Sequence, residues 1–231
     1  MKRSITLFAF CVFLIPALFS PPVFSQNHAD VEQLIQGNTQ FAIDLYKRIK
    51  TTEAGNLFFS PYSISTAASM TYGGARGDTA KQMVDVFHVS LEDQKLHHAF
   101  ADIQSRLNLI QRQKKIELHV ANSLWPQDKY PFLIEYLELV RNCYGAKIEP
   151  VDYDRDPEAA RRRINAWVEK KTKNRIQDII PDTRFLTTPT RLVPANAIYF
   201  KGEWFRRFEK SSTEEMLFYP EKNETIKVPM M

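Results

Sequence analysis

The stretch NLFFSPYSISTAASMTYGGARGDTAKQM, residues 56–83, decides the fold of this chain of 231 residues. It starts with a short apolar run that predicts a strand, which Pro61 stops. Ser60 precedes that proline and is the type of residue that caps a helix, with proline in the first turn. The helix expected from Pro61 is rich in small residues, which allow close packing, and Gly73 and Gly74 are its natural end.

Further helices are predicted on both sides of this stretch. Residues 31–49 place apolar side chains at spacings of three and four, which is typical of an amphipathic helix. Ser90, with an aspartate three residues later, predicts the start of a helix that reaches residue 111. A proline opens the next expected helix, over 131–145, and an Asp-Pro pair opens a long one over 156–180.

Strands are expected mainly in the second half of the chain. At Lys115 the apolar period changes from three or four to two, which predicts a strand that runs into ANSLW. Further strands are predicted over residues 146–153, 190–204, 215–220 and 225–231. Helices dominate early and strands late, without regular βαβ alternation, so the pattern predicts the α+β class rather than a doubly wound sheet.

The first residues have the layout of a cleavable secretory signal. Lys2 and Arg3 precede an apolar run over residues 5–19, and Val23-Phe24-Ser25 ends with the small residue expected at a cleavage site. The apolar run is short for an uncleaved membrane anchor. We therefore expect a signal peptide over residues 1–25, a single domain over 26–231, and a secreted or extracellular protein, periplasmic or at the cell surface in a bacterium, without membrane contact after cleavage.

Charge and cysteine content limit the partners. Removal of Lys2 and Arg3 lowers the formal net charge from +4 to +2, so no general attraction to nucleic acid is expected. Cys143 would be the one cysteine left after signal cleavage, since Cys11 lies in the signal. No intramolecular disulfide is then available, and we expect Cys143 to be a half-buried, inert thiol.

A search for catalytic motifs finds none. The chain has no G-x-S-x-G, H-E-x-x-H, G-x-x-x-x-G-K-[ST] or C-x-x-C. His97 and His98 are adjacent on a predicted helix, so they point about 100° apart and do not easily share one ion. We expect solvated surface histidines there, no metal, no cofactor and no enzymatic activity.

Basic runs occur at residues 112–115, 161–163 and 170–171. Consecutive arginines fan out around a helix, and the run at 161–163 lies opposite the apolar stripe that contains Ile164 and Trp167. A solvated helix face is the favoured interpretation. A site for a sulfated polysaccharide or another polyanion is the weaker alternative.

Several stretches resemble one family, the serpins, in the expected order along the chain. They are the stretch at 56–83, INAWVEKKTKNRI at 164–176, NAIYFKGEW at 196–204 and VPMM at 228–231. The resemblance implies helices packed on a large mixed or antiparallel sheet. It also implies a monomeric inhibitor of serine, and sometimes cysteine, endopeptidases. In that family the protease cleaves an exposed reactive loop, which then inserts as a new strand into the main sheet.

The resemblance assigns roles to four residues. Ser60, Ser63 and Asn196 match the shutter residues, which lie beneath the sheet and govern how its strands part. Trp204 matches the tryptophan of the breach, where an inserting loop enters. Without the resemblance the favoured interpretations are a helix cap for Ser60, a packed polar residue for Asn196 and a core indole for Trp204. Pro194 departs from the family pattern, and we expect it to shorten or loosen its strand because it lacks a backbone donor.

The last predicted strand raises a question about the end of the chain. Ile226, Val228 and Met230 alternate as if to form a buried face, yet the sequence stops at Met231. In a complete serpin the reactive loop follows this strand. The resemblance therefore implies the N-terminal part of a truncated serpin, without the loop that selects the target serine protease. The alternatives are a non-inhibitory binding or carrier protein with a serpin fold and an inactive fragment.

Overall fold

The computed structural model describes residues 28–111, 116–187, 189–220 and 224–231. The expected signal peptide over residues 1–25 and the basic run at 112–115 lie outside these ranges. Within the described ranges, no helix combines the length and the apolar character needed to cross a membrane.

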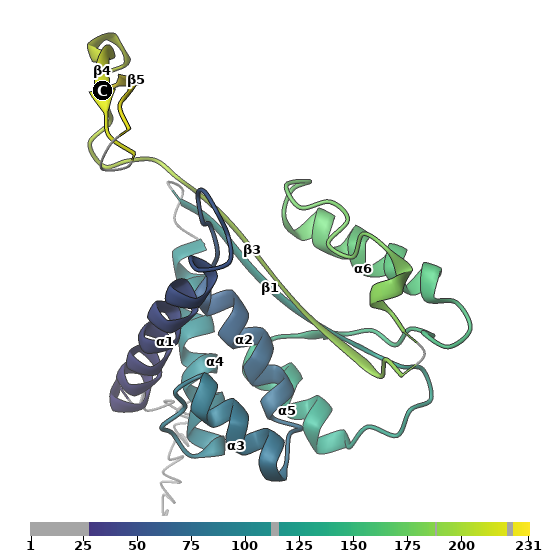
Figure 1. Cartoon of the computed structure of the whole chain (residues 1–231). Helices are drawn as coiled ribbons and strands as arrows, with labels where there is room; N and C mark the ends of the chain where they lie inside the picture. Colours follow the sequence, from purple (N-terminus) through teal and green to yellow (C-terminus); the bar gives the residue numbers. More distant parts are fainter. Residues whose placement is uncertain (1–27, 112–115, 188, 221–223) are drawn as a thin grey trace, which may run out of the picture.

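In the described ranges, six α-helices lie on the two sides of a small sheet (Figure 1). Five of them lie on one side of it and α6, Pro157–Lys171, lies on the other. The five are α1 His28–Ile49, α2 Pro61–Tyr72, α3 Gly77–Val86, α4 Asp93–Gln111 and α5 Ile134–Tyr144. The helix predictions are therefore confirmed in order, with shifted ends.

The main sheet of the described residues has the order β2-β1-β3 and is mixed. β1, Ile116–Pro126, runs parallel to the short β2, Lys147–Ile148, and antiparallel to β3, Leu192–Gly202. β1 and β3 pair along their whole length, from Ile116 opposite Gly202 to Pro126 opposite Leu192. The predicted α+β class is confirmed.

A hairpin of β4, Glu214–Phe218, and β5, Ile226–Met230, extends away from the main sheet (Figure 1). Two short 3₁₀ turns, Thr183–Phe185 and Lys210–Ser212, precede β3 and β4. The predicted closing strand exists, but the expectation of a buried face is wrong for the described residues: Ile226 is 41% exposed, and Val228 and Met230 are half-buried. Pairing with β4 satisfies the backbone of β5 without covering its side chains.

The two faces of the sheet carry separate apolar cores, as the alternation of side chains along a strand requires. Trp125 of β1 and Ala195 and Ala197 of β3 join Ile164 and Val168 of α6 in one core. Leu124 of β1 joins the other core. Its remaining buried members come from α2, α4, α5 and the segment between α5 and β2: Met70, Tyr72, Leu96, Phe100, Val140, Tyr144 and Ala146.

Three predicted elements differ from the structure. Residues 56–60 form no strand, and Phe58 is fully exposed, because no described strand pairs with them. α6 ends at Lys171 rather than at residue 180, since Thr172 caps it and Lys173 and Asn174 take left-handed backbone conformations. The strand expected at 146–153 is reduced to β2 and an isolated bridge between Gln127 and Val151.

The expectation that Pro194 shortens its strand is also wrong. β3 continues through Pro194, which lies opposite Leu124. The carbonyl of Leu124 accepts a hydrogen bond from the backbone N–H of Glu149 at 3.0 Å, so Leu124 directs its backbone groups away from β3. The pair is therefore a non-hydrogen-bonded one, in which the nitrogen of Pro194 faces away from β1 and no ladder bond is lost.

Candidate functional site: a hydrogen-bonded cluster beneath the sheet

The cluster begins at the N-terminus of α2. Ser60 has an extended backbone, and its Oγ accepts a hydrogen bond from the backbone N–H of Ser63 at 3.2 Å. Pro61 follows in the first turn, where its missing N–H costs nothing. Ser60 is therefore the helix cap that the sequence predicts, and this cap fixes the first turn that carries Ser63.

Ser63 connects α2 to the sheet. Its Oγ donates a hydrogen bond to Oδ1 of Asn196 on β3, 133 residues further along the chain. The structure thus brings Ser60, Ser63 and Asn196 together, as the resemblance implies. Each of the three is half-buried.

Asn122 extends the cluster across the sheet and was not singled out from the sequence. It lies directly opposite Asn196 in the register of β1 and β3, and Nδ2 of Asn196 donates to Oδ1 of Asn122 at 2.6 Å. Asn122 lies two residues before Leu124, so its backbone groups point in the same direction and it also forms a non-hydrogen-bonded pair with the residue opposite. In such pairs the opposing side chains lie closest. The signal in the sequence was a polar residue on the otherwise apolar face of the strand, between Val120 and Leu124.

The cluster continues to α5 and α4. Nδ2 of Asn122 donates to the backbone carbonyl of Tyr144 at 2.8 Å. The hydroxyl of Tyr144 lies 2.7 Å from Nδ1 of His97, and both side chains are almost fully buried. A continuous set of polar contacts therefore links α2, β3, β1, α5 and α4, with no charged side chain between Ser60 and Tyr144.

His97 corrects the expectation of two surface histidines. It is 3% exposed, whereas His98 beside it is exposed to solvent. Burial lowers the pKa of His97 to about 4, so its imidazole is neutral at physiological pH. Periodicity did not reveal this burial, because α4 packs against β1, α1 and α5 and its buried face is therefore wider than one apolar stripe.

Trp204 lies apart from this cluster, beyond the end of β3. Its indole is 74% exposed and meets the ring of Phe208 edge to face at 6.1 Å between centroids. The interpretation as a core indole is therefore wrong for the described residues. Exposed aromatic residues, Phe200, Phe205 and Phe208, lie near it in the sequence.

Arg162 and Arg163 of α6 lie on a solvated, ion-paired face, as predicted, whereas Arg161 is half-buried and also donates to the carbonyl of Ile180. Arg161 pairs with Glu158 at 2.9 Å, Arg162 with Glu158 at 3.4 Å, and Arg163 with Glu149 at 3.6 Å. Beneath them, Asn165 exchanges two hydrogen bonds of 2.9 Å with the backbone of Ile180. These contacts fasten the segment after α6 to the helix.

Comparison with known proteins identifies the family. Residues 36–231 match the family model described as Serpin (serine protease inhibitor). The human protein Serpin B3 is 34% identical over 216 residues, which cover 87% of this chain and 55% of that protein. The leukocyte elastase inhibitor of Bos taurus is 39% identical over 202 residues, which cover 87% of this chain and 52% of that protein.

Solved structures agree with this match. The structure of ovalbumin from the emu (Dromaius novaehollandiae) superposes with a TM-score of 0.77 at 31% sequence identity, over 85% of this chain and 54% of ovalbumin. The chain spans about half the length of the curated relatives it matches. Both the family model and the fold lead to the same conclusion: this chain belongs to the serpin family.

Proposed function

We propose that this chain is the N-terminal part of a secreted inhibitor of serine endopeptidases, which acts by cleavage of a reactive loop and its insertion into the main sheet. Family membership supports protease inhibition in general, because the matching model describes serine protease inhibitors. Secretion is proposed from the apolar segment at residues 5–19, and the domain over 26–231 from the same signal. The protein is proposed to act as a monomer on its target protease and not as an enzyme.

The observation that carries this proposal is the position of the polar cluster at the edge of the sheet. Among the described strands, β3 pairs only with β1, so its other edge has backbone groups available to a further strand, except at Pro194, whose nitrogen carries no hydrogen. The side chain of Asn196 projects from this edge strand and bonds to Ser63 below it and to Asn122 beside it. A strand added to β3 would therefore form next to residues whose hydrogen bonds can rearrange.

Each site residue receives a role in this mechanism. Ser60 orients the first turn of α2, Ser63 holds Asn196 against α2, and Asn122 holds β3 to β1. Together they would set the free energy needed to change the spacing of the sheet. Trp204, at the far end of β3, is proposed to lie where an inserting loop enters, and its exposure leaves it free to pack against such a loop.

Inhibition is tested with the protein expressed from the complete coding sequence that contains these residues. It is incubated with trypsin, chymotrypsin and elastase, each at a slight molar deficit. We expect one of these proteases to lose activity irreversibly and to form a covalent complex that survives boiling in detergent. Full protease activity with no complex, for all three enzymes, would contradict the proposal.

A matched pair of variants tests the role of the cluster. Asn196→Ala removes the bonds to Ser63 and Asn122, whereas Asn142→Ala changes an exposed asparagine on α5. We expect the first variant to divert more of the inhibitor into a cleaved, uncomplexed product, and the second to behave as the parent protein. Equal partitioning in both variants would remove the cluster from the mechanism.

A further inference from the structure

A cavity of about 230 Å³ lies between α1 and α4. Both helices lie on the opposite side of the sheet from α6 (Figure 1). Six of the side chains that line the cavity are apolar and come from the facing stripes of the two helices: Val31, Leu34, Ile35, Phe100, Ile103 and Leu107. Their spacings of three and four residues place them on one face of each helix.

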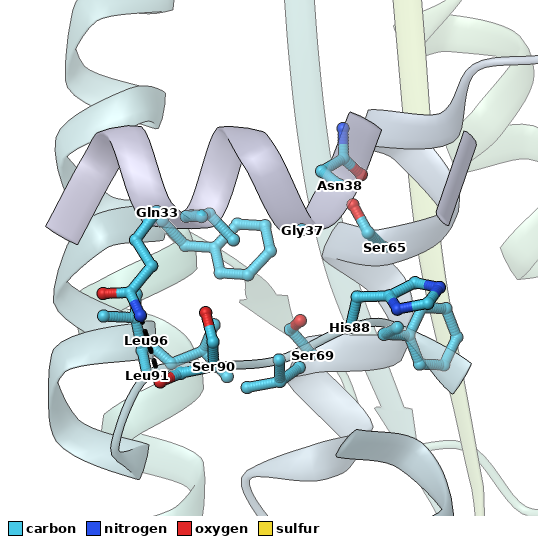
Figure 2. A pocket seen from close by; sticks show the side chains of 13 residues that line it. Gln33, Gly37, Asn38, Ser65, Ser69, His88, Ser90, Leu91 and Leu96 are labelled. Atoms are coloured by element: carbon cyan, nitrogen blue, oxygen red, sulfur yellow. Dashed lines mark hydrogen bonds between the residues drawn. The ribbon is translucent and has the colours of Figure 1, made fainter. Parts of the chain in front are cut away.

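A backbone contact at Gly37 fixes the position of α1 beside this cavity. A Cβ atom at Gly37 would lie 2.5 Å from the carbonyl oxygen of His88, so the helix rests directly on the segment that leads into α4. On the same side, Nε2 of Gln33 donates to the carbonyl oxygen of Ser90 at 3.3 Å (Figure 2). Because these contacts involve backbone atoms, the space between α1 and α4 is preformed.

Arg106 supplies an unpaired positive charge at the wall of the cavity. It is half-buried and forms no salt bridge or hydrogen bond with any described residue. Asp102 precedes it by one helical turn, at a spacing that allows an ion pair, yet no such pair forms. A guanidinium offers five N–H donors in a planar fork, and none of those of Arg106 has an acceptor among the described residues.

Asn38 adds an unpaired acceptor at the same place. Its Oδ1 is buried and has no donor among the described residues. Asn38 lines this cavity and also a smaller one of about 10 Å³, where Figure 2 shows its amide facing the hydroxyl of Ser65. The smaller cavity has room for one water at most. A water in the smaller cavity would satisfy Oδ1 of Asn38, whereas a carboxylate, which only accepts hydrogen bonds, would leave it to that water.

We propose that the cavity between α1 and α4 binds a small apolar carboxylate, with its anionic end on Arg106 and its hydrocarbon body between the two helices. A carboxylate matches the fork of an arginine in a bidentate geometry. The apolar walls disfavour inorganic anions and sugars, which would lose their hydration there. The volume of about 230 Å³ is below the range of about 300–1,000 Å³ that drug-sized ligands occupy, which favours a smaller molecule such as a phenylalkanoic acid. This binding function is independent of protease inhibition.

Isothermal titration calorimetry of the full chain with 3-phenylpropanoate tests the site. The matching alcohol, 3-phenylpropan-1-ol, has the same hydrocarbon body without the charge. We expect the acid to bind with 1:1 stoichiometry and the alcohol to bind at least about tenfold more weakly, as expected for the loss of a charged hydrogen-bond pair. Equal affinity for the two probes, or no heat from the acid at millimolar concentration, would overturn the proposal.

Three variants locate the binding. Arg106→Gln removes the charge and is expected to weaken the acid at least about tenfold. Arg141→Gln, an exposed arginine on α5, is the control and is expected to leave the affinity unchanged. Ile103→Phe fills the cavity but keeps Arg106, so binding should be lost there too. Circular dichroism checks that each variant is folded. If folded Arg106→Gln or Ile103→Phe binds the acid as well as the parent chain, the site is elsewhere.

Discussion

Nδ2 of Asn196 on β3 lies 2.6 Å from Oδ1 of Asn122 on β1, and the two asparagines are directly opposite in the register of the sheet. Each also bonds to a helix on the same side of the sheet, Asn196 to Ser63 of α2 and Asn122 to the backbone of Tyr144 at the end of α5. One pair of amides therefore joins two strands and two helices.

Replacement of Asn122 by alanine tests the energetic weight of this pair. Asn122 is 4% exposed, so the change leaves Nδ2 of Asn196 and the carbonyl of Tyr144 without their partner. We expect the free energy of unfolding in urea to fall by about 1–3 kcal/mol. In a double-mutant cycle with Asn196→Ala, the coupling energy should be about 0.5–3 kcal/mol. If the two substitutions lower the free energy of unfolding additively, the hydrogen bond between Asn122 and Asn196 makes no coupling contribution to stability.

The burial of His97 predicts a loss of stability in mild acid. Burial lowers the pKa of its imidazole to about 4, whereas a histidine in the unfolded chain titrates near 6.5. Between these values the unfolded state binds a proton and the folded state does not. The free energy of unfolding is therefore intact above pH 6.5, decreases as the pH falls from 6.5 to about 4, and levels off below that. The decrease due to His97 is about 3 kcal/mol.

Urea unfolding at a series of pH values measures this dependence. His97→Gln should remove this part of the slope, because glutamine does not titrate. His98→Gln removes the smallest of the influences on the pKa of His97, whose main cause is burial, and should leave most of the slope in place. If His97→Gln retains the full slope between pH 4 and 6.5, other groups are responsible.

The sequence predicted the helices and strands that carry this site better than it predicted the side-chain contacts between them. The cap at Ser60 follows from a serine followed by proline, and β3 follows from its apolar alternation. Asn122 was missed because only the register of β1 against β3 places it opposite Asn196. His97 was placed on the surface because helical periodicity describes one buried face, whereas α4 is covered from several directions.

The errors in strand prediction have a common physical cause. A strand exists only when its backbone finds a partner, and local sequence does not contain the partner. The apolar run at residues 56–60 has no partner strand in the described part of the chain, so it has no regular structure there. Pro194 shows the opposite error, in which a predicted interruption is absent. Its missing donor faces the edge of β3 that no described strand pairs with, so the strand continues through it.

Asn165 fastens the segment after α6, and its replacement by alanine should release that segment. Its amide both donates to and accepts from the backbone of Ile180, at 2.9 Å in each case, and the side chain is 7% exposed. We expect the amide hydrogen of Ile180 to exchange faster by at least about tenfold, which corresponds to about 1.4 kcal/mol. Lys170→Ala, on the exposed face of α6, is the control. Unchanged protection at Ile180 would show that other contacts hold the segment.

Gly37→Ala should reverse the usual effect of this substitution in a helix. An alanine in place of an interior glycine normally stabilises a helix by about 1 kcal/mol. At Gly37, however, the new methyl group would lie 2.5 Å from the carbonyl oxygen of His88, which is backbone and cannot rotate away. We expect a lower midpoint of thermal unfolding, by several degrees, since overpacking of this kind costs about 1–3 kcal/mol. Gln36→Ala changes the exposed neighbour and should leave the midpoint nearly unchanged. A midpoint that rises in Gly37→Ala would show that α1 can move away from the 88–91 segment, in which case the space between α1 and α4 is adjustable rather than preformed.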